Sequence, residues 1–202
     1  MPIYQLAGVT PVIHPTAYVH PTAVIIGDVH IGEECYIGPL ASLRGDFGAI
    51  KLGKGVNIQD CVVVHSFKDI TVIVEDFGHI GHGAILHGCT IRKGVLVGMS
   101  ATVMDKAEIG ARSFIGAHSF VKTGDSFPEG TMILGTPAKA VRELTDEETA
   151  WKHKGTEAYI ALAKESINSC IEVEPLKEAE PNRKKINIGE TVLPKQDTLK
   201  PQ

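Results

Sequence analysis

The stretch ILHGCTIRKGVLVGMSATVMDKAEIGARSFIGAHSFV, residues 85–121, decides the fold. Within it an aliphatic residue recurs every six positions: Ile85, Ile91, Val97, Val103, Ile109, Ile115 and Val121. A period of six fits neither an amphipathic helix nor a plainly alternating strand. It is typical of a β-solenoid, in which each six-residue unit is a short strand followed by a corner. We therefore predict that three units close a triangular coil of about 18 residues, with the aliphatic side chains stacked inside it.

The same period extends toward the N-terminus in two earlier runs. They are Ile13, Val19, Ile25, Ile31, Ile37 and Leu43, and then Leu52, Ile58 and Val64. The phase changes between Leu43 and Leu52 and again between Val64 and Ile85, which predicts insertions near 44–51 and 66–77. Insertions in solenoids form loops, often on the functional face.

Composition supports a single solenoid domain with a small appendage. Of 202 residues 21 are glycine and 5% are aromatic, as expected for a core of stacked aliphatic side chains. The net charge of −4 gives no reason to expect a nucleic-acid partner. We find no signal peptide and no apolar run long enough to span a membrane. Cys35 and Cys89 fall on small-residue positions of the repeat, which indicates packing thiols in a reducing, cytoplasmic environment.

The chain changes character after Val121. We expect the repeat to stop there and the segment 123–141 to lead out of the solenoid. Our domain division is therefore a metal-binding β-helix over 1–141, a C-terminal helix over 142–171 and an extended tail over 172–202.

The helix has a clear start. Thr145 and Glu148 have the spacing of a capping box. We expect Gly155 to break this helix and Thr156 to cap a second piece. The face of that piece expected to pack on the solenoid carries Tyr159, Leu162, Ala163, Ser166, Ile167 and Cys170.

Three histidines are the candidate metal ligands: His65, His82 and His87. Three histidines with one open position form a catalytic zinc arrangement. His65 and His87 lie about one coil apart once the insertion is subtracted, so they can stack on one edge and share a metal. His82 precedes His87 by up to ~16 Å of extended chain, so it is expected to point at a neighbouring copy. Ligands shared in this way predict a homotrimer with three sites.

Another histidine, His79, occupies an aliphatic slot of the repeat. It is either a spare ligand or a buried, hydrogen-bonded side chain, and we favour the second interpretation.

Two polar clusters accompany the histidines. In a strand, Asn57 and Gln59 point the same way, and Gln59 can orient a metal-bound water. We name both as candidate catalytic residues. Arg44 can form an ion pair across the subunit seam with Asp46 or Asp60, unless Arg44 and Asp46 are simple turn residues.

The order of these motifs resembles the γ-class carbonic anhydrase family over about residues 10–170. The motifs are RGD (44–46), NIQD (57–60), His65, GHIGHGAILHGC (78–89) and GTPAK (135–139). The resemblance implies a left-handed parallel β-helix and a homotrimer. It also implies Zn²⁺ (or Fe²⁺ or Co²⁺) on His65, His87 and a neighbour's His82. It further implies that Gln59 orients water and that Arg44 and Asp60 meet at the subunit seam. Tyr159 resembles a helix tyrosine of that family that reaches the metal pocket.

Within that family, five segments are similar to the branch of phenylacetic acid degradation and carnitine operon proteins: 1–12, 41–48, 97–105, 150–159 and 174–185. This branch implies a metal-dependent thioesterase that hydrolyses CoA thioesters formed in phenylacetate degradation. The alternative within the family is a γ-type carbonic anhydrase that hydrates CO2. The loop 66–78 has Asp69, Glu75 and Asp76 but no acid at the family's proton-shuttle position, so we expect slow CO2 hydration.

Two further alternatives belong to other classes. A hexapeptide acyltransferase shares the solenoid and uses a histidine as base on an acceptor, without a three-histidine metal site. A non-enzymatic accessory protein would keep the metal only as a link between subunits. If the substrate is a CoA thioester, Arg183, Lys184 and Lys185 are expected to anchor its phosphates.

Overall fold

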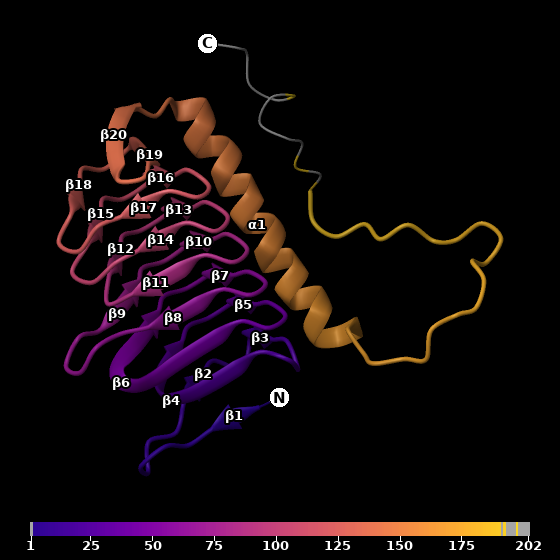
Figure 1. Ribbon diagram of the computed structural model, residues 1–202. Coiled ribbons are helices and arrows are strands. Elements are labelled where there is room, and N and C mark those ends of the chain that lie inside the picture. Colours follow the sequence, from indigo (N-terminus) through magenta and orange to yellow (C-terminus); the bar gives the residue numbers. More distant parts are fainter. Residues whose placement is uncertain (1, 191, 193–196, 198–202) are drawn as a thin grey trace.

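The computed structural model describes residues 2–190, 192 and 197 and is a left-handed parallel β-helix. Figure 1 shows the coils stacked one above another, with a single long helix lying along one side of the stack. The fold class predicted from the six-residue period is confirmed.

Each coil contributes one short strand to each of three walls. The first wall contains β1 (Ile3–Tyr4), the first halves of β4 (Val24–Ile31) and β6 (Ser42–Leu52), β8 (Val63–His65), β11 (Ile85–His87), β14 (Thr102–Val103) and β17 (Phe120–Val121). The second wall contains β2 (Val12–Ile13), the second halves of β4 and β6, β9 (Val72–Val74), β12 (Thr90–Ile91), β15 (Glu108–Ile109) and β18 (Ser126–Phe127).

The third wall ends in the only antiparallel pairing recorded among the described strands. It contains β3 (Tyr18–Val19), β5 (Tyr36–Ile37), β7 (Asn57–Ile58), β10 (His79–Ile80), β13 (Leu96–Val97), β16 (Phe114–Ile115), β19 (Thr131–Gly135) and β20 (Ala138–Glu143). Parallel pairing holds corresponding residues of successive coils in register, as Tyr18 with Tyr36 and Thr102 with Phe120.

The core is the column of aliphatic side chains inside the coils. Ile25, Ile37, Leu43, Ile91 and Ile115 have no solvent exposure, as the period predicts. The phase of one predicted core position was wrong, however. Ile85 points outward and is 41% exposed, whereas its neighbour Leu86 is fully buried.

The same shift of one residue applies to the preceding strand. Ile80, and not His79, fills the core position of β10. The corner after β11 is one residue shorter than the others, and it turns at Gly88 with φ +57°, a conformation that glycine adopts without strain.

The insertions and the end of the repeat also differ from the prediction. The segment 44–51 is not a separate loop but an irregularity within β6, where the register with β4 shifts between Gly27 and Val29. The second insertion is confined to 66–71, because β9 already belongs to a regular coil. The repeat continues beyond Val121: Phe127 packs on the core and Ile133 is buried within it.

Helix α1 (Asp146–Ser169) packs on β3, β5 and β7 of the third wall. The predicted capping box is present: Thr145 accepts from the N–H of Glu148, and the Glu148 carboxylate accepts from the N–H of Thr145. The predicted break at Gly155 is wrong. One glycine costs a helix only about 1 kcal/mol, and docking on the wall outweighs that cost.

The buried face of α1 is more polar than predicted. Glu148, Lys152, Thr156, Ala163 and Ser166 are buried, whereas the predicted face residues Ile167 and Cys170 are exposed.

Beyond Ser169 the chain leaves the helix and loops away from the solenoid (Figure 1), and Gly189 lies back against Ala161 of α1. Across residues 2–190, 192 and 197 there is no helix with the length and apolarity needed to cross a membrane.

The corrected core phase can be tested by truncating the two neighbouring side chains. Leu86→Ala should lower the free energy of unfolding by about 2–5 kcal/mol, because it leaves a cavity in a filled column. Ile85→Ala removes a partly exposed side chain and should cost less than about 1 kcal/mol. Denaturant unfolding of both variants measures the difference, and equal losses would contradict the assignment of Leu86 to the core.

Candidate metal centre

His65 and His87 lie side by side on the first wall. They are the last residues of β8 and β11 and are directly paired in the parallel register. Their ring centroids are 5.2 Å apart. The structure therefore brings together two of the three predicted metal ligands at the edge where the first wall meets the 66–71 loop.

A carboxylate holds each of these two rings. Asp46 Oδ1 lies 2.9 Å from His65 Nε2, and Asp105 Oδ1 lies 2.8 Å from His87 Nδ1. Because an ionised carboxylate only accepts hydrogen bonds, each of these ring nitrogens carries the proton. Carboxylates in this position fix the tautomer and orientation of metal-ligating histidines.

The approach of Asp105 to His87 depends on the short corner. A Cβ on Gly88 would lie 2.3 Å from Asp105 Oδ1, so only glycine leaves room for the carboxylate. Our sequence reasoning missed Asp105. The signal was its position 18 residues after His87, which is one coil further along.

The remaining ring nitrogens, His65 Nδ1 and His87 Nε2, face each other at 3.2 Å. With the protons directed to the carboxylates, both nitrogens present lone pairs, which repel unless a proton or cation lies between them. Two nitrogens that each bind zinc at ~2.0–2.1 Å in tetrahedral geometry are ~3.3 Å apart. The donor set therefore fits two corners of a tetrahedral divalent metal site.

His82 lies elsewhere on the chain, at the corner between the third and first walls. Its ring is 48% exposed and its Nδ1 lies 2.8 Å from Asp60 Oδ2. Within the part of one chain that the structure describes, no three His, Cys, Asp or Glu side chains form a group that could hold a metal ion. One chain thus offers His65 and His87 together, with His82 exposed and apart from them.

The predicted seam residues have partners within the chain. Arg44 lies 3.5 Å from Asp46, whose carboxylate also holds His65. Asp60 is paired with His82 and not with Arg44. Asp46 is therefore more than a turn residue, and an Arg44–Asp60 pair between subunits stays a prediction.

Gln59 is held in a buried polar network beneath α1. Its Nε2 donates to Asn57 Oδ1 at 2.9 Å and to His79 Nε2 at 2.8 Å. His79, favoured above as a hydrogen-bonded side chain, also contacts Asn57 at 3.2 Å and Thr156 at 3.4 Å. In the described residues no group donates to Gln59 Oε1, so the amide is anchored through its nitrogen and presents an acceptor oxygen.

Two titratable side chains of α1 border this network. Burial, followed by the nearby charges of Tyr36 and Asp60, raises the pKa of Tyr159 to about 12, so its hydroxyl stays protonated. The Tyr159 ring packs on His79 with centroids 5.3 Å apart. Burial lowers the pKa of Lys152 to about 7, and its Nζ donates to the carbonyl oxygen of Phe77 at 2.6 Å. Burial, with the charges of Lys152 and His82, also lowers the pKa of His79 to about 3, so the ring is neutral.

Of the three acidic residues of the segment 66–78, two lie beyond the insertion and are engaged in the solenoid itself. Glu75 pairs with Arg92 at 2.7 Å and accepts from the N–H of Lys93. Asp76 accepts from the N–H of Lys54 at 2.9 Å. Only Asp69 lies in the loop 66–71 itself.

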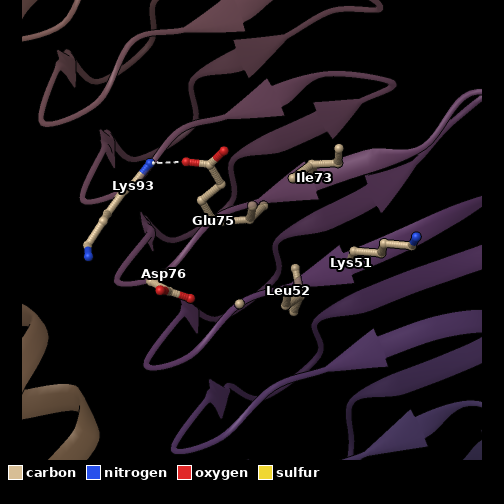
Figure 2. A pocket seen from close by; sticks show the side chains of 8 residues that line it. Lys51, Leu52, Ile73, Glu75, Asp76 and Lys93 are labelled. Carbon is tan, nitrogen blue, oxygen red and sulfur yellow. Dashed lines mark hydrogen bonds between the residues drawn. The ribbon is translucent and has the colours of Figure 1, made fainter.

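A hollow of about 330 Å³ on the second wall contains none of the predicted site residues. Lys51, Leu52, Ile73, Glu75, Asp76 and Lys93 line it (Figure 2). Its carboxylates are the ones already held by Arg92 and by main-chain N–H groups.

Comparison with known proteins identifies the repeat and gives full-length relatives. The model of bacterial transferase hexapeptide (six repeats) matches residues 10–45 and 88–123. The carnitine operon protein CaiE of Proteus sp. (strain LE138) is 48% identical over 195 residues, which cover 96% of this chain and 99% of that protein. CaiE of Escherichia coli (strain K12) is also 48% identical over 96% of the chain.

Solved structures share the fold. A hexapeptide transferase family protein from Anaplasma phagocytophilum is 39% identical with a TM-score of 0.78, covering 81% of this chain and 96% of that one. A hexapeptide-repeat acetyltransferase from Vibrio cholerae, solved with acetyl-CoA, has 23% identity and a TM-score of 0.51, covers 58% of this chain and 72% of that one, and shows the fold alone.

The buried lysine predicts a pH-dependent stability difference. Between about pH 7 and pH 10.5 the unfolded chain binds a proton at Lys152 that the folded chain does not, so this group's contribution to the free energy of unfolding rises with pH. Lys152→Met should therefore be most favourable relative to the parent near pH 7. Its advantage should shrink by about 2–4 kcal/mol toward pH 10.5.

Denaturant unfolding of parent and variant at several pH values measures this difference. Lys154→Met, an exposed lysine of the same helix, is the control and should show no such trend. A constant difference between parent and Lys152→Met would contradict a neutral Lys152 in the folded protein.

Proposed function

We propose that this chain, which belongs to the CaiE family of hexapeptide-repeat proteins, is a metal-dependent hydrolase, acting as a thioesterase on CoA thioesters of aromatic-acid (phenylacetate) degradation. The observation that carries the proposal is the pair of facing nitrogens of His65 and His87, each ring oriented by a carboxylate. A structural histidine pair has no need of two separate carboxylates that turn both lone pairs to one point.

We assign the third ligand to His82 of a second copy, in a homotrimer. Two features of the surface support this assignment. His82 stands at an exposed corner with its Nε2 unengaged by the described residues. The first wall, beside the His65–His87 edge, exposes Val63 and Ile85 by 40% and 41%, and apolar side chains on a wall favour contact with another protein surface.

The corner that carries His82 would bring other groups with it. Asp60, which follows Gln59 in the chain, is bonded to His82, so Gln59 and His82 would enter a shared site together. Gln59 Oε1 would then be available to accept a hydrogen bond from the attacking water and orient it. The Tyr159 hydroxyl, protonated at neutral pH, can bound the pocket or donate to the substrate carbonyl oxygen.

A divalent metal held by these histidines, Zn²⁺ or else Fe²⁺ or Co²⁺, would supply an activated water and polarise the thioester carbonyl. Asp46 and Asp105 keep the ligand tautomers correct throughout, since their hydrogen bonds fix which ring nitrogens are free. The thiolate leaves readily, so the chain needs no strong general acid for this reaction.

Three other functions compete with this one. An acyltransferase would use the same CoA thioester but pass the acyl group to an amine or hydroxyl; the bacterial transferase hexapeptide model and the Anaplasma phagocytophilum hexapeptide transferase family protein are the matches that raise this alternative. A carbonic anhydrase would use the same histidines on CO2. A non-enzymatic accessory protein would bind the metal without turnover. Product analysis with and without an added acceptor distinguishes the hydrolase from the acyltransferase.

If the metal is shared, removal of either kind of ligand should empty the site. His82→Ala and His87→Ala should lose metal to the same extent, measured by elemental analysis of dialysed protein. A mixed trimer of the two variants should regain some metal, because one seam then pairs an intact His65–His87 edge with an intact His82.

Full metal content in His82→Ala would contradict the shared geometry. His30→Ala is the control, because that exposed histidine pairs only with Asp28 and should leave metal content unchanged.

Gln59→Ala tests the water-orienting role. The variant should keep its metal and its trimer but lose about tenfold or more in kcat on a CoA thioester, as changes next to metal ligands typically do. Lys51→Ala on the second wall is the matched control and should keep full activity. Unchanged kcat in Gln59→Ala would show that Gln59 serves only packing.

Substrate preference distinguishes the thioesterase from the carbonic anhydrase. We expect measurable hydrolysis of aryl- or ring-derived CoA thioesters and weak CO2 hydration, because Glu75 and Asp76 are engaged elsewhere and are not available as proton shuttles. Truncation after Cys170 should raise KM for the CoA ester more than it lowers kcat, since it removes Arg183, Lys184 and Lys185. Rapid CO2 hydration with no thioester hydrolysis would favour the carbonic anhydrase.

A further inference from the structure

Two phenylalanine side chains stand exposed on either side of the histidine pair. Phe47, from the irregular segment of β6, is 64% exposed, and its ring centroid is 5.6 Å from that of His65. Phe67, from the loop after β8, is 60% exposed, and its ring lies edge-on at 5.0 Å from His87. The two insertions that interrupt the repeat thus each place one aromatic ring against one of the two histidines.

The segments that carry these rings are locked to each other. A Cβ on Gly48, next to Phe47, would lie 2.0 Å from the carbonyl oxygen of Ile70 and 2.7 Å from that of Phe67, so the two backbones touch at this glycine. Ser66 Oγ donates to the carbonyl oxygen of Ile70 at 2.7 Å. The N–H of Ile70 donates to the carbonyl oxygen of Phe67 at 3.2 Å. Phe67 therefore sits on a hydrogen-bonded turn, and the segment that carries Phe47 packs directly against that turn.

We propose that Phe47 and Phe67 form the acyl-binding subsite and select CoA thioesters with a flat, apolar acyl group; this inference rests on the thioesterase function proposed above. A substrate bound at the His65–His87 edge would have both rings as neighbours, because each ring centroid lies 5.0–5.6 Å from that of one histidine. A planar acyl group gains stacking and edge contacts with these rings that an acetyl group cannot make.

The charges around the rings indicate what kind of acyl group they accept. Aromatic rings also bind quaternary ammonium groups, but such sites work best without competing cations. Here Lys68 follows Phe67 in the chain, Arg44 lies 3.5 Å from Asp46, and Asp46 also holds His65. The surroundings favour a neutral acyl group attached to an anionic CoA.

The test compares the parent with Phe47→Ala, Phe67→Ala and the double variant, all as full-length, metal-loaded protein. The substrates are phenylacetyl-CoA, benzoyl-CoA, acetyl-CoA and the trimethylammonium substrate γ-butyrobetainyl-CoA. Each single variant should lose about 5–10-fold in kcat/KM on the two aryl esters and less than about twofold on acetyl-CoA. Phe47→Leu should retain most activity on aliphatic esters but lose the aryl preference. Val141→Ala, an exposed apolar residue of β20, is the control and should change nothing.

Direct binding keeps this inference separable from the proposed function. The non-hydrolysable thioether S-phenacyl-CoA should bind the parent at least fivefold more tightly than S-acetonyl-CoA in calorimetry, and the double variant should erase the difference. If that holds while no thioester is hydrolysed, the subsite stands and the thioesterase assignment fails. If thioesters are hydrolysed but the double variant leaves the aryl-to-acetyl ratio unchanged, the subsite is wrong.

Two further outcomes would also overturn the subsite. One is a preference for the trimethylammonium ester that the double variant removes. The other is loss of the oligomer in sedimentation when either phenylalanine is replaced, which would mean that a second copy covers the rings.

Discussion

Parallel stacking of coils in register is the constraint on which this structure depends. Each core residue stacks on its counterpart in the previous coil, so the outward-facing side chains of successive coils are also aligned in register. His65 above His87, His87 beside Asp105, and Asp60 beside His82 are all contacts between successive coils. The candidate metal site is thus built from residues 18 to 22 positions apart, and not from neighbours in the sequence.

This constraint explains what could be predicted from the sequence. The six-residue period identified the solenoid and most of its core, and coil spacing placed His65 next to His87. It could not choose between Ile85 and Leu86, because both are aliphatic and the one-residue shortening at Gly88 has no signature until the two strands are paired. Asp105 was missed for a similar reason. An aspartate at a corner gives no functional signal until it is known that a strand of the preceding coil ends in His87 beside it.

The helix was predicted less well, and the physical cause is different. Its start follows from a capping box, which is a local interaction between Thr145 and Glu148. Its packing face was sought among apolar residues, whereas the wall beneath it presents the polar side chains of Asn57, Gln59 and His79. The helix matches this polar surface with Thr156 and with Lys152, whose pKa is lowered by burial. Hydrophobicity was therefore the wrong guide to this interface.

The same solenoid supports acyltransferases, so fold alone does not decide the chemistry. The feature of this chain that bears on its chemistry is the orientation of the His65 and His87 rings. A histidine that acts as a base on an acceptor needs one free nitrogen directed at a substrate. Here His65 and His87 direct their free nitrogens at each other, across a distance that suits a metal ion better than a substrate hydroxyl. The two insertions, which add Asp46 behind one ring and a phenylalanine beside each, modify this edge of the repeat. Folding of the repeat alone does not require two interruptions at one edge, and their position beside the histidine pair is what the proposed reaction would need.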